Sequence, residues 1–330
     1  MGKNIVNSQS SDHLILDAKD RRLLLALFEN GRATTTALAK KIGVSQEVAN
    51  YRLSRLKKTG LLKRVIPIIN LAALGYDTFR LQLRFGPMNE ATKEKFVAQA
   101  VRTPQLSWFV RLAGPWDVVL LFSSQSIQEF SKIYNELIDD WGTHIDEKLL
   151  TIVTKIQHFP PTFLLGGTHN PLIVGTNTQR HALEPNQAKI LKQLLFDGRK
   201  PLLEIARETS LSMATVKYHV ELLQKRNVLL GFRPLLDYKT LQYDYFKVTI
   251  ELQNPNERQQ LEQRLLANNN IVYITESLGK YDLEFECCFL TVEELLACIE
   301  SLKRTVHIQS YEIIFRNEEL IVNAIPEVEQ

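Results

Sequence analysis

The amino-acid sequence carries the same pattern twice, and this internal repeat constrains the fold more than any other feature. Moving the sequence by 167 positions places segment 16–79 over segment 183–246. Gly31-Arg32 then meets Gly198-Arg199, and Tyr76-Asp77 meets Tyr243-Asp244. Farther along, with the offset reduced by two residues, RLAGPWDVVLLF meets ESLGKYDLEFEC. Most of the 330 residues therefore form two diverged copies of one unit.

Each copy is predicted to begin with three helices. In the first copy, apolar residues recur with helical spacing over 23–28, after Asp17, a residue type that caps helices. A short helix follows over 35–41, Gly43 supplies a turn, and Ser45 caps a third helix that Gly60 ends. The inner stripe of this third helix is formed by Ala49, Leu53 and Leu56. The pattern predicts a helix-turn-helix unit.

The remainder of each copy is predicted to be a ferredoxin-like βαββαβ domain, an antiparallel sheet with two helices on one face. In the first copy, a strand over 62–71 follows the helices, and the βαββαβ strands are expected over 77–85, 106–114, 117–122 and 148–157, with helices over 89–102 and 126–141. The second copy repeats this order from 245 to 320. The expected fold class is α+β, with two copies of a winged helix-turn-helix followed by a ferredoxin-like sheet domain.

These elements divide the chain into six expected segments. They are a flexible tail (1–14), a first winged helix-turn-helix (15–70), a first ferredoxin-like domain for ligand sensing and oligomerisation (71–160), a linker (161–182), a second winged helix-turn-helix, for which degeneration is one alternative (183–237), and a second ferredoxin-like domain (238–330). The linker is inferred because that stretch is rich in Pro, Gly, Thr and Asn and has no sustained period.

Positive charge is concentrated in the first helical unit. The whole chain has a formal net charge of only +3, yet segment 17–66 holds twelve Lys/Arg against four Asp/Glu, a net charge of +8. Such a local excess indicates a polyanionic partner for that segment. The chain has no apolar run long enough to span a bilayer and no secretory signal pattern, so we expect a cytoplasmic protein.

The third helix of the first copy is predicted to read double-stranded DNA. Its outer face carries hydrogen-bonding and cationic side chains, which can bind base edges in the major groove, while lysines at the helix end neutralise phosphates. These residues are Gln46, Asn50, Tyr51, Arg52, Arg55, Lys57 and Lys58.

The second copy departs from the first at this helix. Lys217 replaces Asn50, His219 replaces Arg52 and Leu222 replaces Arg55, and segment 184–233 has a net charge of +4. Lys217 and His219 are its candidate DNA contacts. We expect weaker binding there: the second unit either binds a different half-site or serves in dimerisation and packing.

The residues of both copies resemble the Lrp/AsnC (leucine-responsive, feast/famine) family of transcriptional regulators. Segment 16–62 resembles the family's winged helix-turn-helix, and WFVRLAGPWDVVLLF, with its G-x-x-D turn, resembles the ligand-sensing domain. The resemblance implies a homo-oligomeric, sequence-specific regulator with an amino acid or related metabolite as effector. It implies effector contacts from two turns, at Gly114, Trp116, Asp117 and at Gly279, Tyr281, Asp282.

Both turns also have a purely structural interpretation. Gly and Asp are common in hairpins, because Gly adopts positive φ and Asp bonds local backbone. Trp116 and Tyr281 could equally pack in an interface. The residues leave these alternatives open.

The same architecture also resembles the siroheme decarboxylases, enzymes of alternative haem synthesis, which bind a tetrapyrrole with many carboxylates. His144, His158 and His307, with Arg111, are available for such a role, but the strands 106–114 and 272–280 lack the expected histidine. No phosphate loop, metal motif or nucleophile elbow is present, and the three cysteines lack zinc or disulfide spacing. We therefore expect no enzyme activity, catalytic residue, metal or cofactor. A sensor or adaptor that has lost DNA binding is the third alternative.

Overall fold

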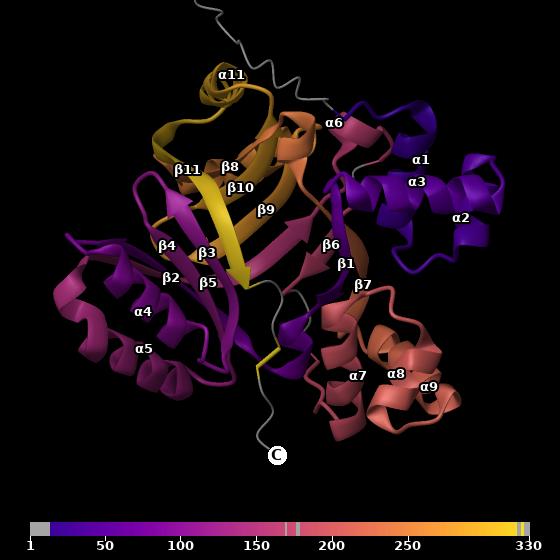
Figure 1. Ribbon diagram of the computed structural model, residues 1–330. Coiled ribbons are helices and arrows are strands. Elements are labelled where there is room, and N and C mark those ends of the chain that lie inside the picture. Colours follow the sequence, from indigo (N-terminus) through magenta and orange to yellow (C-terminus); the bar gives the residue numbers. More distant parts are fainter. Residues whose placement is uncertain (1–13, 169, 176–178, 322–324, 327–330) are drawn as a thin grey trace, which may run out of the picture.

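The computed structural model describes residues 14–168, 170–175, 179–321 and 325–326, so the expected flexible tail lies almost entirely outside the described residues. Both helical units lie on one side of a large β-structure (Figure 1). The expected α+β class with a duplicated architecture is confirmed.

The two helical units form where the capping residues lie. In the first, α1 (Ala18–Glu29), α2 (Thr35–Ile42) and α3 (Gln46–Lys58) start at Asp17, Thr34 and Ser45, whose side chains accept backbone N–H bonds. The second unit consists of α7 (Pro185–Phe196), α8 (Leu202–Thr209) and α9 (Met213–Lys225). Each unit has a core of its own, centred on Leu27 in the first and Leu194 in the second.

The strand after each helical unit pairs with its equivalent in the other copy. β1 (Leu62–Ile69) and β7 (Leu229–Leu236) form a two-stranded antiparallel sheet, called here the ribbon. Each helical unit packs closely on the ribbon at a glycine. A Cβ on Gly31 would lie 2.8 Å from Phe232 Cβ, and one on Gly198 would lie 2.7 Å from the Val65 carbonyl oxygen, so a larger residue would not fit at either position.

Two arginines cross between the helical units. Arg32 donates to the carbonyl oxygens of Gly198 (2.5 Å) and Lys200 (2.8 Å), and Arg199 donates to those of Gly31 (2.6 Å) and Ala33 (2.8 Å). These reciprocal bonds explain why Gly-Arg recurs in both copies, and they fix the two units relative to each other.

The two ferredoxin-like sheets join edge to edge into a closed barrel. The first copy supplies β2 (Asp77–Phe85), β3 (Leu106–Ala113), β4 (Val118–Ser124) and β5 (Ile145–His158). The second supplies β8 (Asp244–Leu252), β9 (Ile271–Leu278), β10 (Leu283–Phe289) and β11 (Ile308–Ile321). The strands β3 and β11 pair across the two copies, as do β5 and β9, and these two junctions close the circle. The pairings within each copy are antiparallel as well.

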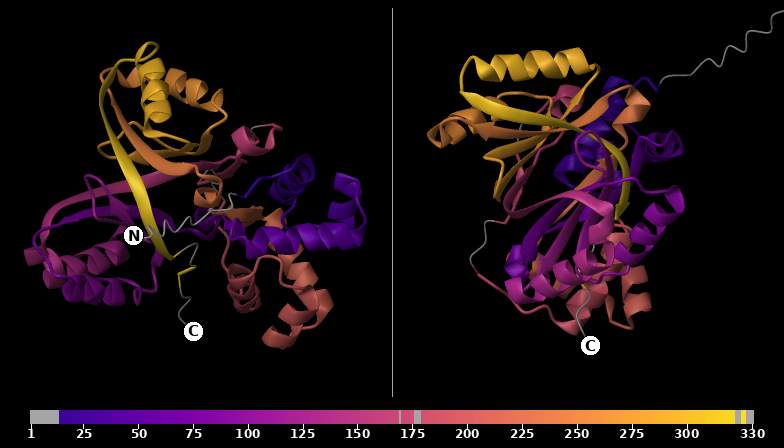
Figure 2. Two further views of the ribbon diagram at one scale, coloured as in Figure 1. Left: turned by 45° about the horizontal axis from the view of Figure 1, so that its top comes forward. Right: turned by 90° about the vertical axis from the view of Figure 1, so that its left-hand side faces the viewer.

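Helices cover the outside of the barrel (Figure 2). α4 (Glu90–Ala100) and α5 (Ile127–Trp141) enclose one apolar core around Phe96 and Phe122, and α10 (Arg258–Leu266) and α11 (Val292–Lys303) enclose another around Phe285. Apolar side chains therefore fill the space between helices and strands, while many strand residues that point into the barrel are polar.

The expected linker contains more structure than its composition indicates. α6 (Thr162–Leu165) packs Leu164 and Leu165 into the core of the first helical unit, and β6 (Leu172–Val174) pairs with the end of β5. A short segment can form such elements despite its weak pattern, because the apolar surfaces that stabilise it belong to distant parts of the chain.

Candidate nucleic-acid interface and barrel cavity

The outer face of α3 presents five of the seven predicted DNA contacts to solvent. Gln46, Asn50, Tyr51, Lys57 and Lys58 are all accessible, and 67% of Tyr51 is exposed. Ala49 and Leu56 of the predicted inner stripe are fully buried. The exposed side chains offer amide, hydroxyl and ammonium groups without competing carboxylates other than Glu47.

Arg52 and Arg55 lie differently from the expectation, because both turn toward the start of α1. Arg52 Nη1 lies 2.7 Å from Asp17 Oδ2 and 2.8 Å from Asp20 Oδ1, and Arg55 Nη2 pairs with Asp20 Oδ2. The Asp20 side chain is fully buried. Hydrogen bonds from the Asp20 backbone and from Arg52 lower the pKa of Asp17 to about 2. The two arginines therefore tie α3 to α1 rather than project freely.

The second copy presents a different surface. Lys217 is exposed and lies 3.8 Å from Glu221 on the next turn of α9. His219, predicted as a DNA contact, is 7% exposed, and its Nδ1 has no hydrogen-bond partner among the described residues. That prediction is wrong as to accessibility: His219 lies on the inner face of α9, as its equivalent in the first copy, Arg52, turns toward α1.

The two G-x-x-D turns meet at the end of the barrel that lies away from the ribbon. Trp116 and Tyr281 are 3% and 2% exposed. Trp116 Nε1 donates to Glu312 Oε2 (3.1 Å), and the Tyr281 hydroxyl donates to the same oxygen (2.7 Å), while Lys280 binds Glu312 Oε1 (2.7 Å). The aromatic side chains of both turns are thus used within the barrel, as the packing alternative expects.

The turn aspartates have structural partners as well. Asp117 Oδ2 accepts a bond from the Phe85 amide (2.7 Å), and Asp282 Oδ2 accepts one from the Leu252 amide (2.8 Å). Gly114 and Gly279 have φ of +126° and +138°, and both approach a strand of the other copy. These contacts account for the turn pattern without a ligand.

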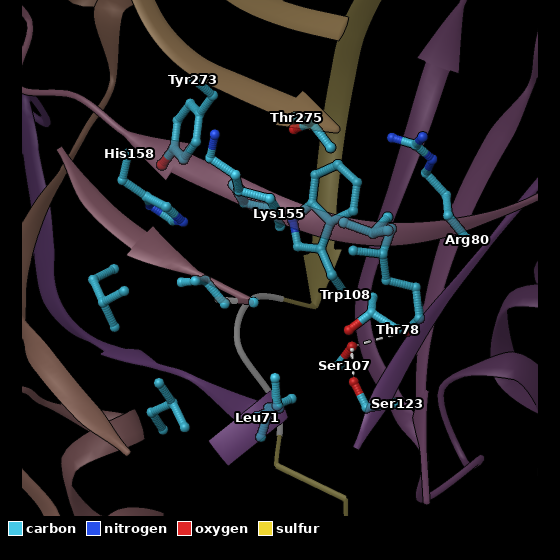
Figure 3. Close-up of a pocket in the computed structure, with 18 of the residues that line it drawn as sticks. Leu71, Thr78, Arg80, Ser107, Trp108, Ser123, Lys155, His158, Tyr273 and Thr275 are labelled. Atoms are coloured by element: carbon cyan, nitrogen blue, oxygen red, sulfur yellow. Dashed lines mark hydrogen bonds between the residues drawn. The ribbon is translucent and has the colours of Figure 1, made fainter. Parts of the chain in front are cut away.

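A cavity of about 410 Å³ lies at the ribbon end of the barrel (Figure 3). The ribbon contributes Ile66, Ile68 and Leu235, and β6 contributes Val174. The barrel contributes a polar wall that includes Trp108, Lys155, His158, Tyr273 and Thr275. The cavity is thus apolar on the side of the helical units and polar on the side of the barrel.

Each cation that lines this cavity has a carboxylate partner. Arg80 pairs with Glu284, and Lys247 Nζ lies 2.9 Å from Glu284 Oε2. Lys155 Nζ lies 2.6 Å from Glu276 Oε1 and 3.1 Å from Glu262 Oε1. Arg316 lies 3.7 Å from Glu319 and 3.8 Å from the centre of the Tyr245 ring.

Two pKa values reflect this environment. Burial alone would raise the pKa of Glu284, but the charges of Arg80 and Lys247 outweigh it and lower the pKa to about 2. Burial lowers the pKa of His158 to about 3, and the charge of Arg233 adds to this effect. At neutral pH the cavity therefore presents a neutral imidazole, which contacts the Tyr273 ring at a centroid distance of 4.5 Å.

The other histidines considered for an enzyme lie elsewhere. His307 is exposed and pairs with Glu257 at 2.8 Å, and His144 lies beside Trp141 outside the barrel. Arg111 pairs with Glu94 (2.6 Å) and Glu318 (3.5 Å). Within the described residues, we find no group of His, Cys, Asp and Glu suited to a metal ion. Nor does any helix in this part of the chain have the length and apolar character needed to cross a membrane.

Comparison with known proteins defines the family. A winged helix-turn-helix DNA-binding family matches residues 16–63. An uncharacterized HTH-type transcriptional regulator of Pyrococcus horikoshii is 31% identical over 121 residues, which are 36% of this chain and 80% of the relative. The chain belongs to the Lrp/AsnC family of transcriptional regulators. The leucine-responsive regulatory protein of Rhizobium meliloti is 26% identical over 139 residues, 42% of this Lrp/AsnC chain and 89% of the relative.

A solved structure matches the Lrp/AsnC chain over nearly its whole length. The siroheme decarboxylase NirDL has a TM-score of 0.63 and covers 95% of each chain, with 13% sequence identity. At this identity the likeness establishes the duplicated fold alone, and it says nothing about the reaction.

Sequence reasoning did not find the cavity. Its lining residues come mainly from eleven strands and the segment 71–76, so no local pattern announces it. One signal was available: Tyr273 and Thr275 are polar residues that alternate with Val272 and Ile274 in one strand segment.

Proposed function

We propose that this protein is a sequence-specific, DNA-binding transcriptional regulator that reads its site mainly through α3. The observation that carries the proposal is the exposed face of α3, where Gln46, Asn50 and Tyr51 stand beside Lys57 and Lys58. An α-helix fits the major groove, Asn and Gln can bind adenine with two hydrogen bonds, and lysines neutralise phosphates.

Arg52 and Arg55 have a different part in this proposal. Because both pair with buried Asp20, they fix the angle between α3 and α1 and so position the exposed face of α3. The readers are then the uncharged side chains Gln46, Asn50 and Tyr51, and the affinity common to all sequences comes from the surrounding lysines and arginines.

The second helical unit is proposed as an auxiliary DNA contact. α9 keeps Lys217 and Tyr218 on its exposed face, but Lys217 has a carboxylate neighbour, Glu221. The Arg32 and Arg199 bonds hold both units in one arrangement, so a site would have two unequal halves at a fixed spacing.

The test is a selection of bound fragments from genomic DNA of the source organism by the purified full chain. Affinity for the selected duplex is then measured by fluorescence anisotropy, beside a scrambled duplex, at rising salt. We expect preference for the selected duplex and a steep loss of affinity with salt, because phosphate contacts release counterions. Equal affinity for both duplexes, or affinity indifferent to salt, contradicts the proposal.

A siroheme decarboxylase role has less support from the cavity. A substrate with many carboxylates requires surplus cationic side chains, whereas Arg80, Lys155, Lys247 and Arg316 already pair with glutamates. Mixing the protein with siroheme and recording its visible spectrum is a direct check. A tight complex with a shifted Soret band would favour the enzyme over the regulator.

A further inference from the structure

We propose that the ribbon-end cavity binds a small, uncharged, largely apolar metabolite, and that its occupancy shifts the ribbon and thereby changes DNA binding. The inference deepens the proposed function, on which its regulatory half rests. It assigns the ligand to the cavity and not to the two G-x-x-D turns.

The principal side chains of the turns are already engaged inside the barrel. Trp116, Tyr281 and Lys280 all bind Glu312, and Asp117 binds the Phe85 backbone. A ligand there would first have to displace these contacts, of which the bond from Trp116 to Glu312 joins the two copies.

The cavity has the size and chemistry of a small-molecule site. Its volume of about 410 Å³ falls within the range of about 300–1,000 Å³ usual for ligand pockets. Apolar side chains of the ribbon and β6 form one wall, represented by Ile66, Leu235 and Val174. A molecule with a large apolar surface would bury that surface against this wall.

Charge pairing selects against an anionic ligand. Four cations line the cavity, and five carboxylates lie against them, those of Glu262, Glu276, Glu284, Glu286 and Glu319. A carboxylate or phosphate would therefore have to compete for each cation with a carboxylate already in place, at a cost in desolvation. An uncharged ligand meets no such competition.

Two neutral groups at the cavity surface can orient the ligand. The Tyr273 ring and the His158 imidazole contact each other at a centroid distance of 4.5 Å, and both line the cavity (Figure 3). Burial raises the pKa of Tyr273 and lowers that of His158, so both side chains are uncharged at neutral pH. A hydroxyl donates and an imidazole accepts or donates, so together they can bind one polar end of the molecule.

The ribbon connects the cavity to both helical units. β1 starts at Leu62, four residues after α3 ends at Lys58, and β7 starts at Leu229, four residues after α9 ends at Lys225. The close approaches at the two Gly-Arg positions press both units against the same ribbon. A ligand that displaces the ribbon wall therefore moves α3 and α9 together. An allosteric effector must contact two states of the protein differently, and the ribbon before and after displacement supplies those two states.

The test uses three uncharged probes, indole, p-cresol and 2-naphthol, with indole-3-acetate as the anionic match of indole. Saturable binding to the full chain is measured by calorimetry or by ligand-observed NMR. We expect at least one neutral probe to bind with a dissociation constant below about 1 mM, and indole-3-acetate to bind about tenfold or more weakly than indole. No saturable binding of any neutral probe, or equal binding of indole and indole-3-acetate, overturns the assignment.

Variants of cavity residues test where the probes bind. Val174→Trp should place an indole ring in the cavity and block probe binding, and Tyr273→Phe should weaken it about threefold to tenfold by removing one hydroxyl. Tyr134→Phe removes the same atom from α5, outside the barrel and away from both proposed DNA-binding faces, and serves as control. Circular dichroism and melting temperature check that each variant folds. Binding that survives Val174→Trp in a folded protein contradicts the proposal; if that variant fails to fold, unchanged binding by folded Tyr273→Phe does so.

The coupling between ligand binding and DNA binding is measured separately, as the DNA affinity with and without saturating probe. We expect a change of about threefold or more in the parent and none in Val174→Trp. Probe binding without any change in DNA affinity overturns the coupling alone. Failure of all DNA binding, with probe binding intact, overturns the proposed function but leaves the ligand site standing.

Discussion

In the first helix-turn-helix unit, ion pairs join the first and third helices, whereas the second unit has neutral side chains at the same positions. In the first unit, buried Asp20 pairs with Arg52 and Arg55. The equivalent residues of the second unit are Gln187, His219 and Leu222. Gln187 is 1% exposed and His219 7% exposed, so the positions of Asp20 and Arg52 are internal in the second copy as well.

This difference changes the meaning of the lost arginines. Their absence from α9 looks like a loss of DNA contacts when the sequence is considered alone. In the structure, an acid and its two basic partners have been replaced together, which preserves the joint between the first and third helices. Under the proposed function, a contrast in DNA binding therefore comes from the exposed faces, where Asn50 and Tyr51 correspond to Lys217 and Tyr218.

The largest effect is expected from removing Asp20 from its ion pairs with Arg52 and Arg55, called here the charged joint. Asp20→Ala leaves two partly buried arginines without this partner, and should lower the free energy of unfolding by about 2–4 kcal/mol. Gln187→Ala, the matched change in the second unit, removes no charge and should cost about 1 kcal/mol. Urea denaturation measures both; equal costs would remove the distinction between the joints.

Replacing the charged joint of the first unit by the neutral residues of the second unit sharpens the comparison. The triple variant Asp20→Gln, Arg52→His, Arg55→Leu copies the second unit, and should recover most of the stability lost in Asp20→Ala, leaving a deficit of about 1 kcal/mol, because no buried charge is left unpaired. Denaturation of the triple variant beside each single variant gives the coupling. A triple variant no more stable than Asp20→Ala would show that the three positions do not act as a set.

A pH effect distinguishes the ends of the two long strands. β5 ends in His158, whose pKa is about 3, whereas β11 ends in Ile321. The unfolded chain takes up a proton at this histidine near pH 6.5, but the folded chain does not, so stability is complete above pH 6.5 and falls as the pH drops toward 3. His158→Leu should reduce the loss between pH 7 and pH 5 by about 1–2 kcal/mol, measured by denaturation at each pH. Ile156→Leu, in the same cavity, is the control and should keep the parent's profile.

The smallest effect concerns salt. Lys57→Ala with Lys58→Ala should weaken binding to all duplexes and reduce the slope of log affinity against log salt by up to about 1.8, because two phosphate contacts are lost. Lys95→Ala with Lys132→Ala removes the same charge from α4 and α5 and should leave the slope nearly unchanged. An equal reduction in both pairs would mean that net charge alone attracts DNA.

Particular residues show how far the sequence could predict this molecule. The caps Asp17 and Ser45 and the stripe of Ala49 and Leu56 predict the helices, because a helix depends on neighbours three and four residues away. The barrel was not predicted: its closure depends on the edges of β3 and β11, about 200 residues apart, and edge pairing leaves no local pattern.

The site residues divide in the same way. Exposure of Asn50 and Tyr51 followed from helical spacing, but the inward turn of Arg52 depends on Asp20, which lies 32 residues earlier. The family resemblance implied ligand contacts at Trp116 and Tyr281, and interface packing was the alternative. No local pattern connects these residues with their partner, Glu312, which lies 196 and 31 residues away from them. The internal repeat did hold one clue to the charged joint, namely the combined replacement of Asp20, Arg52 and Arg55 in the second copy.

The most direct test compares the two exposed faces on the selected DNA site. Asn50→Ala with Tyr51→Ala should weaken specific binding about tenfold or more, with little change in affinity for scrambled duplex, because base contacts and not phosphate contacts are lost. Lys217→Ala with Tyr218→Ala should weaken it by less than about threefold. Equal losses from the two pairs, or an unchanged affinity in the α3 variant, would contradict the account that α3 reads the DNA.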